Sequence, residues 1–102
     1  MDGFAKVGNT SILTPGTMKL VRTPSGKRLL VNLRGKYYAL APECTHQGCS
    51  LVEGKLEGDS VFCFCHFAEF KVTTGQVLEG PAEEPLQTFE VRIEDSELWV
   101  AI

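Results

Sequence analysis

The stretches CTHQGC at residues 44–49 and CFCH at residues 63–66 contain all four cysteines and both histidines of the chain. Thiolate and imidazole ligands together suit zinc, copper or iron-sulfur chemistry, and they disfavour metals that prefer oxygen. The spacing does not match a zinc finger, which takes a C-x(2-4)-C pair on a hairpin and an H-x(3-5)-H pair on a helix. Two loops that each offer one Cys and one His can place both sulfurs on one iron and both nitrogens on a second. We therefore expect these stretches to hold a transition metal or a cluster.

Composition bounds the size and class of the protein. The chain has 102 residues, of which 43% are hydrophobic and 23% are charged, as in an ordinary globular domain. A formal net charge of -3 provides no basic field that would attract nucleic acid, so we exclude that partner. No stretch approaches the ~20 apolar residues of a spanning helix, and we expect no membrane span in this chain.

Charge is distributed unevenly along the sequence. Residues 1–42 hold seven of the ten basic residues and one acidic residue, whereas residues 43–102 hold twelve acidic and three basic residues. The acidic part could form a docking face for a basic partner. We favour the alternative, in which both signs interleave on a solvated surface once the chain folds.

Short β-strands fit the sequence better than helices, because Gly or Pro interrupts almost every window of about twelve residues. We expect an all-β antiparallel sandwich or barrel of about nine or ten short strands. We expect a single domain over residues 1–102, with a base from residues 1–42 and 73–102 and a small lobe over about 43–72 that carries the cysteines. Strands are predicted at residues 17–22, 28–33, 36–41, 51–55, 60–64, 70–72, 76–78, 86–93 and 98–102.

The two cysteine stretches resemble the boxes of the Rieske iron-sulfur proteins, which read C-x-H-x-G-C and C-x-C-H in the disulfide-bearing branch of the family. Sixteen residues separate His46 from Cys63, which fits the family's usual gap. The run Gly80-Pro81-Ala82, followed by Pro85-Leu86, resembles the proline loop that covers the cluster in that family. The resemblance extends over essentially the whole chain.

The resemblance implies one 2Fe-2S cluster per chain. By this carry-over Cys44 and Cys63 bind the inner iron, His46 and His66 bind the outer iron, and Cys49 is bonded to Cys65 in a disulfide. Replacing two thiolates by two neutral imidazoles raises the reduction potential to about -150 to +300 mV, against about -400 mV for plant-type centres with four Cys. A Cys49–Cys65 bridge would tie the two ligand stretches together and contribute roughly 3 kcal/mol in the chain-entropy model.

The second stretch departs from the pattern C-P-C-H-G-S-x-Y that disulfide-bearing Rieske proteins of quinol-oxidising complexes usually show. This chain has Phe64, Phe67, Ala68 and Phe70 at the Pro, Gly, Ser and Tyr positions. Two hydroxyl groups that donate hydrogen bonds to cluster sulfurs in the family are thus missing, so we expect a potential in the lower or middle part of the range. Phe67 also conflicts with a backbone position that requires a positive φ. We expect Phe62, Phe64 and Phe70 to be core or cluster-shielding residues, and Phe67 either to pack or to contact a partner.

Several other readings of the same residues exist. The four cysteines could form two structural disulfides, or Cys44, His46, Cys63 and His66 could hold a structural zinc ion. Cys49 and Cys65 could be two free buried thiols, or the active pair of a metal-free thiol-disulfide sensor. A Rieske oxygenase is excluded, because its second iron needs two further histidines and both histidines of this chain are already used.

The expected function is therefore one-electron transfer without catalysis by the chain itself. It resembles small Rieske ferredoxins that carry electrons from a flavin reductase to an oxygenase or another terminal enzyme. The alternative is the soluble head of a membrane quinol-oxidising complex or a subunit of a molybdenum oxidase. We expect a cytoplasmic location, although a disulfide favours a periplasmic or membrane-associated complex.

Overall fold

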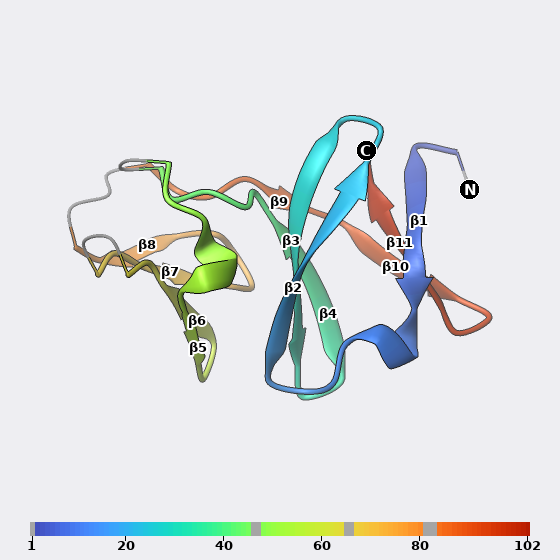
Figure 1. Cartoon of the computed structure of the whole chain (residues 1–102), viewed down its shortest axis with the longest axis horizontal. Coiled ribbons are helices and arrows are strands. Elements are labelled where there is room, and N and C mark those ends of the chain that lie inside the picture. The colour runs from blue at the N-terminus through green and yellow to red at the C-terminus, as the bar shows by residue number, and fades with distance from the viewer. Residues whose placement is uncertain (1, 46–47, 65–66, 81–83) are drawn as a thin grey trace.

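The computed structural model describes residues 2–45, 48–64, 67–80 and 84–102. Within these residues it contains eleven strands in three antiparallel sheets and two short 3-10 turns. The molecule is elongated, 40 × 26 × 19 Å, with one sheet forming a lobe at one end and two sheets forming the base (Figure 1). The expected all-β architecture with a separate lobe is confirmed.

The base consists of two sheets that pack face to face. One sheet has the order β1-β11-β10, with β1 at Phe4–Asn9, β11 at Glu97–Ala101 and β10 at Val91–Glu94. The other has the order β2-β3-β4-β9, with β2 at Thr17–Thr23, β3 at Gly26–Leu33, β4 at Lys36–Leu40 and β9 at Thr88–Phe89. A 3-10 turn, η1, at Thr10–Ile12 connects β1 to the segment before β2.

The lobe is a sheet of four short strands. Its order is β5-β6-β7-β8, with β5 at Lys55–Glu57, β6 at Ser60–Phe62, β7 at Glu69–Lys71 and β8 at Val77–Glu79. A second 3-10 turn, η2, spans Leu51–Glu53. Strand β8 continues this sheet beyond residue 72, where the sequence expectation placed the end of the lobe. We use "the lobe" below for residues 43–86.

The central strand β3 explains how the lobe is attached. Leu29 and Val31 belong to the hydrophobic core between this sheet and the lobe, whereas Leu30 belongs to the core between the two base sheets. Because both faces of β3 are covered, its apolar residues form a continuous run instead of alternating with polar ones. The lobe therefore packs on a sheet that is already held from the other side.

Two sequence expectations for these elements were wrong. Residues 51–53 form η2 instead of a strand, and the strand begins only at Lys55. The single strand expected at residues 86–93 is split into β9 and β10, because β9 pairs with β4 and β10 pairs with β11. The chain thus changes sheets at Glu90, which no local pattern indicates. Strand β1 was not expected either, and it forms by pairing with β11 at the other end of the chain.

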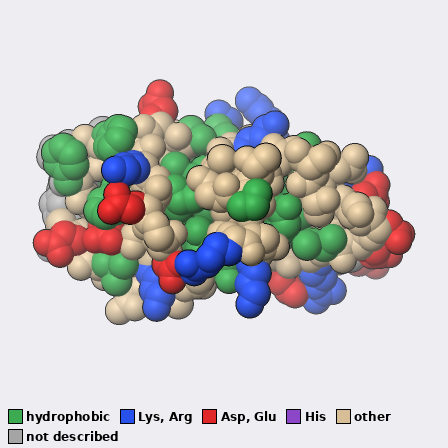
Figure 2. Space-filling model, turned by 90° about the horizontal axis from the view of Figure 1, so that it is seen from below, with side chains coloured by type: hydrophobic (Ala, Val, Ile, Leu, Met, Phe, Trp, Pro, Cys, Tyr) green, Lys and Arg blue, Asp and Glu red, His purple; other side chains and the backbone are tan. Residues whose placement is uncertain are grey.

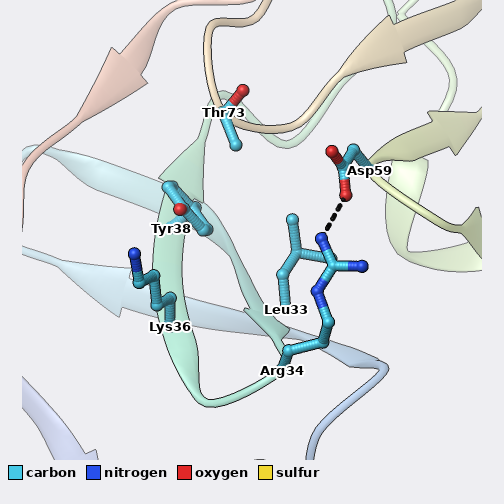
Figure 3. A pocket seen from close by; sticks show the side chains of 6 residues that line it. All are labelled: Leu33, Arg34, Lys36, Tyr38, Asp59 and Thr73. Carbon is cyan, nitrogen blue, oxygen red and sulfur yellow. Dashed lines mark hydrogen bonds and ion pairs between the residues drawn. The ribbon is translucent and has the colours of Figure 1, made fainter.

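A direct link between base and lobe is shown in Figure 3. Arg34, in the turn between β3 and β4, donates a hydrogen bond of 2.9 Å to Asp59, which lies in the turn between β5 and β6. The pair borders a pocket of about 200 Å³ that is lined by Leu33, Arg34, Lys36, Tyr38, Asp59 and Thr73. Because both side chains are substantially exposed, this ion pair adds little stability, and the buried core between the sheets does most of the joining.

Charges are not interleaved over the lobe in the way we favoured from the sequence. Residues 43–86 contain eight acidic residues and only two basic ones, Lys55 and Lys71. The basic residues of the first 42 positions lie instead on β1, β2, β3, β4 and the turn after β3. Mixed pairs occur, as between Lys6 and Glu97, but the lobe as a whole is acidic.

Candidate metal centre

Two loops of the lobe, residues 44–49 and residues 63–68, share one pattern of backbone hydrogen bonds between their described ends, and we call them the matched loops. In the first loop, the Cys44 N–H donates to the Cys49 carbonyl and the Gly48 N–H donates to the Cys44 carbonyl, both at 2.8 Å. In the second loop, the Cys63 N–H donates to the Ala68 carbonyl and the Phe67 N–H donates to the Cys63 carbonyl, also at 2.8 Å. In each loop the described ends thus meet across six positions of the chain, with a cysteine at the first of them.

Both loops are closed by antiparallel backbone pairs. Glu43 pairs with Ser50 beside the first loop, and Phe62 pairs with Glu69 beside the second. Short ladders of this kind hold the two ends of a loop at a fixed separation, which orients the first side chain of the loop. Each cysteine stretch forms a loop because the residue just before it and a residue just after it pair with each other.

Cys44 and Cys63 are buried, with 4% and 1% of their surface exposed. Both belong to the hydrophobic core that also contains Leu51, Val61 and Phe70, and Cys49 is half-buried against the same core. Two thiols held in apolar surroundings by matched loops fit the sulfur half of a cluster site, in which the shell around the sulfurs controls access of water. The donor chemistry of the described residues thus agrees with an iron-sulfur centre.

Part of the expected ligand set lies outside the described residues. This applies to His46, Cys65 and His66, and also to Gln47 and to residues 81–83 of the proline loop. The ligand assignments of His46 and His66, and the expected Cys49–Cys65 disulfide, therefore stay predictions.

The aromatic residues of the second stretch differ in their environments. Phe70 is fully buried in the lobe core and Phe62 is half-buried, in line with the expected shielding role. A core position for Phe64 is wrong, because 57% of this residue is exposed, and its shielding of a cluster stays a prediction. Phe64 directly follows the buried Cys63 in the chain but does not belong to the lobe core.

Residue 67 has a positive φ, the conformation that the sequence analysis identified as unfavourable for phenylalanine. Phe67 has φ = 60°, and Gly48, at the same position of the first loop, has φ = 72°. A side chain at positive φ costs of order 1 kcal/mol or more, which glycine avoids. Phe67 is 69% exposed and so recovers little of that cost through packing.

The segment that begins at Gly80 is attached to both loops. The Thr45 hydroxyl donates a hydrogen bond of 2.7 Å to the Glu84 carbonyl. At the other end of the segment, the Gly80 backbone lies so close to the second loop that a Cβ built on Gly80 would be 2.8 Å from the Ala68 Cα. Sequence reasoning assigned no role to Thr45 and none to the close approach of Gly80, because both depend on contacts between residues far apart in the chain.

Neither 3-10 turn, nor any other part of the described chain, provides a helix with the length and apolar character needed to cross a bilayer.

The sequence of this chain is similar to a known protein family and to individual members of it. A family model described as "Rieske [2Fe-2S] domain" matches residues 3–90. The chain is 38% identical over 99 residues to the ferredoxin CarAc of Metapseudomonas resinovorans, covering 96% of this chain and 92% of that protein. It is 36% identical over 97 residues to the ferredoxin component of biphenyl 2,3-dioxygenase from Rhodococcus jostii (strain RHA1), covering 95% and 91% of the two chains.

A solved structure is similar over the same extent. It is a complex of reduced oxygenase and oxidized ferredoxin in carbazole 1,9a-dioxygenase, and one of its chains superposes with a TM-score of 0.92 at 33% identity. The match covers 99% of this chain and 94% of that chain. The base, the lobe and the two matched loops therefore form an arrangement that is shared with a protein of known structure.

Proposed function

This chain belongs to the Rieske [2Fe-2S] family, and from that membership we propose that it carries single electrons from a reductase to the oxygenase component of a multicomponent oxygenase. It is an electron-transfer component and not itself the catalyst of the oxygenation. The matched loops, which bury Cys44 and Cys63 in one core, carry this assignment together with nearly full-length similarity to dioxygenase ferredoxins.

The cluster has one proposed ligand set. Cys44 and Cys63 hold one iron, and His46 and His66 hold the other. The burial of both described thiols supports the sulfur half of this set, and the C-x-H and C-x-x-H spacings support the imidazole half. When bound, such a cluster supplies one electron at a potential of about -150 to +300 mV. Leu51, Val61 and Phe70 exclude water from the inner side of the site.

The Cys49–Cys65 disulfide is part of the proposal. Cys49 is the last residue of the first loop, and its carbonyl accepts the N–H of the proposed ligand Cys44. A bridge from this position to the second stretch would connect the two ligand loops covalently. The metal-free thiol-disulfide sensor considered from the sequence is not supported, since membership of the family implies the cluster.

The cytoplasm is the proposed location, by analogy with the ferredoxin components to which the chain is similar. Fractionation of the source cells, with detection of the protein in the cytosolic fraction, tests this. Recovery from the periplasm or with a membrane complex would favour the quinol-oxidising alternative instead.

The decisive test of the function is reconstitution. Purified protein should contain two irons and two acid-labile sulfides per chain. With NADH, the flavin reductase and the oxygenase component of carbazole 1,9a-dioxygenase, product formation should depend on added protein. Zinc in place of iron would overturn the cluster assignment. A protein that has its cluster and is chemically reducible, but supports no turnover, would overturn the electron-carrier role in such a system.

A further inference from the structure

The second loop presents two aromatic side chains to solvent. Phe64 and Phe67 are 57% and 69% exposed and lie three residues apart on the turn that begins at Cys63. They are two of five large hydrophobic residues exposed in the described part of the chain. Phenylalanine is usually buried, and an exposed apolar patch marks a contact surface more often than an accident of folding.

Folding does not account for the ring of Phe67. The position has a positive φ, and the first loop fills its equivalent position with Gly48. Open space surrounds the place where a Cβ would stand at Gly48, so the first loop needs no side chain there for packing, and in the second loop the ring of Phe67 is 69% exposed. Phe67 therefore adds a conformational cost and an exposed ring to a turn that glycine builds without either.

A pair of carboxylates lies at the base of the same loop. Glu69 and Glu79 are direct partners across β7 and β8, and Glu69 follows the loop immediately. Like charges opposite each other on neighbouring strands are destabilising. Within the described chain, no ion pair joins either glutamate to a Lys or Arg side chain. A cationic group brought by a partner would relieve this repulsion.

The wider charge distribution has the same sign. Eight acidic and two basic residues occur in the lobe, whereas the basic residues of positions 1–42 lie on the base. Figure 2 shows hydrophobic and acidic side chains next to one another at the lobe end of the molecule. Such a charge separation orients the lobe toward a basic surface during diffusional encounter.

We propose that Phe64 and Phe67 are the apolar anchors by which this protein docks on its electron acceptor, a protein with an apolar patch bordered by Lys or Arg residues that face Glu69 and Glu79. This inference rests on the proposed function and names the contact chemistry of its partner. Aromatic side chains at the centre of an interface, surrounded by polar contacts, commonly contribute most of the binding free energy. The acidic residues contribute mainly to the association rate and its salt dependence.

The test uses the reduced holoprotein and the oxygenase component of carbazole 1,9a-dioxygenase as acceptor. Electron transfer is followed against oxygenase concentration, which separates the half-saturating concentration from the limiting rate. Phe67→Gly and Phe64→Ala should each raise the half-saturating concentration about tenfold, a typical hot-spot effect, with an unchanged limiting rate and reduction potential. Phe67→Gly is suited to this purpose because glycine fits the turn.

Ile93→Ala is the matched control, because Ile93 is 54% exposed but lies on β10 in the base. Its half-saturating concentration should equal that of the wild type. The double variant Glu69→Gln/Glu79→Gln removes two of the charges that attract a basic partner. The association rate of this variant should therefore depend less on salt concentration than that of the wild type.

The docking role is overturned if both Phe variants stay within twofold of the wild type. It is also overturned if they change only the limiting rate or the potential, since the rings would then act on the cluster's surroundings. Failure of the function itself looks different. In that case wild-type protein is reoxidised by the small acceptor ferricyanide but passes no electrons to the oxygenase, and the docking proposal falls with the function.

Discussion

Thr45 donates its hydroxyl hydrogen to the Glu84 carbonyl oxygen at 2.7 Å, which joins the first cysteine loop to the segment that follows Gly80. The two residues are 39 positions apart in the chain. A neutral hydrogen bond of this kind contributes about 0.5–1.5 kcal/mol, and its exposed setting places it at the lower end of that range. The bond thus acts less on global stability than on the local attachment of this segment.

We predict that Thr45→Val, which keeps the shape but removes the hydroxyl, accelerates loss of the cluster and lowers the free energy of unfolding by about 0.5 kcal/mol. Thr45→Ser retains the donor and serves as the control. The rate of cluster loss is measured anaerobically, as the decrease of visible absorbance in the presence of a chelator. The free energy of unfolding is measured by urea denaturation. Equal bleaching rates for the Val and Ser variants would show that the hydrogen bond has no such role.

Gly80→Ala should destabilise the lobe by about 1–3 kcal/mol, because it combines two costs. Gly80 has φ = 94°, and its Cβ would meet the Ala68 Cα at 2.8 Å. Gly16→Ala isolates the conformational part, since Gly16 has φ = 80° with open space around its Cβ. Urea midpoints of the two variants give the comparison, and a Gly80→Ala cost no larger than that of Gly16→Ala contradicts the steric term.

Phe67→Gly is predicted to raise the free energy of unfolding by about 0.5–1 kcal/mol. Relief of the positive φ favours the folded state by ~1–2 kcal/mol, and the greater freedom of glycine in the unfolded chain offsets part of that gain. Denaturant titration of the holoprotein measures the difference. A loss of more than about 1 kcal/mol would contradict the prediction, because it would mean that the ring packs on the loop.

Ala68→Ser should raise the reduction potential. Ala68 is fully buried, and its carbonyl already accepts the Cys63 N–H, so a hydroxyl at this position would lie beside the proposed sulfur ligand. A hydrogen bond worth ~1 kcal/mol more in the reduced state corresponds to roughly 40 mV for one electron. Equilibrium redox titration tests the shift, with Ala5→Ser on β1 as the control. An unchanged or lower potential for Ala68→Ser refutes the proposed placement.

Cys49→Ser should lower the free energy of unfolding by roughly 3 kcal/mol, because the proposed disulfide closes a loop of about 16 residues in the unfolded chain. Cys65→Ser should have the same effect, and the double variant should add nothing further. Mass spectrometry of the unreduced protein after proteolysis detects the linked peptides directly. Two separate thiols in that experiment would remove the disulfide from the proposal.

Much of the architecture could be predicted from the sequence. Strands β2, β3 and β4 were all expected, because turn residues separate their apolar runs. Five of their six ends agree with the expectation to within one residue, and β3 begins two residues earlier than expected. The division of residues 86–93 could not be predicted, since β9 and β10 pair with different sheets. Whether a strand continues or changes sheets depends on its neighbours, and these come from distant parts of the chain.

The sequence by itself determined the chemical class of the centre. Metal preference depends on the type of ligand side chain, and the Cys and His residues and their spacing are given directly by the sequence. The tertiary structure decided what surrounds it. Burial of Cys44 and Cys63, exposure of Phe64 and the contact of Thr45 with Glu84 all depend on which segments meet in space. Packing of this kind is a property of the whole chain, and no single stretch of residues contains it.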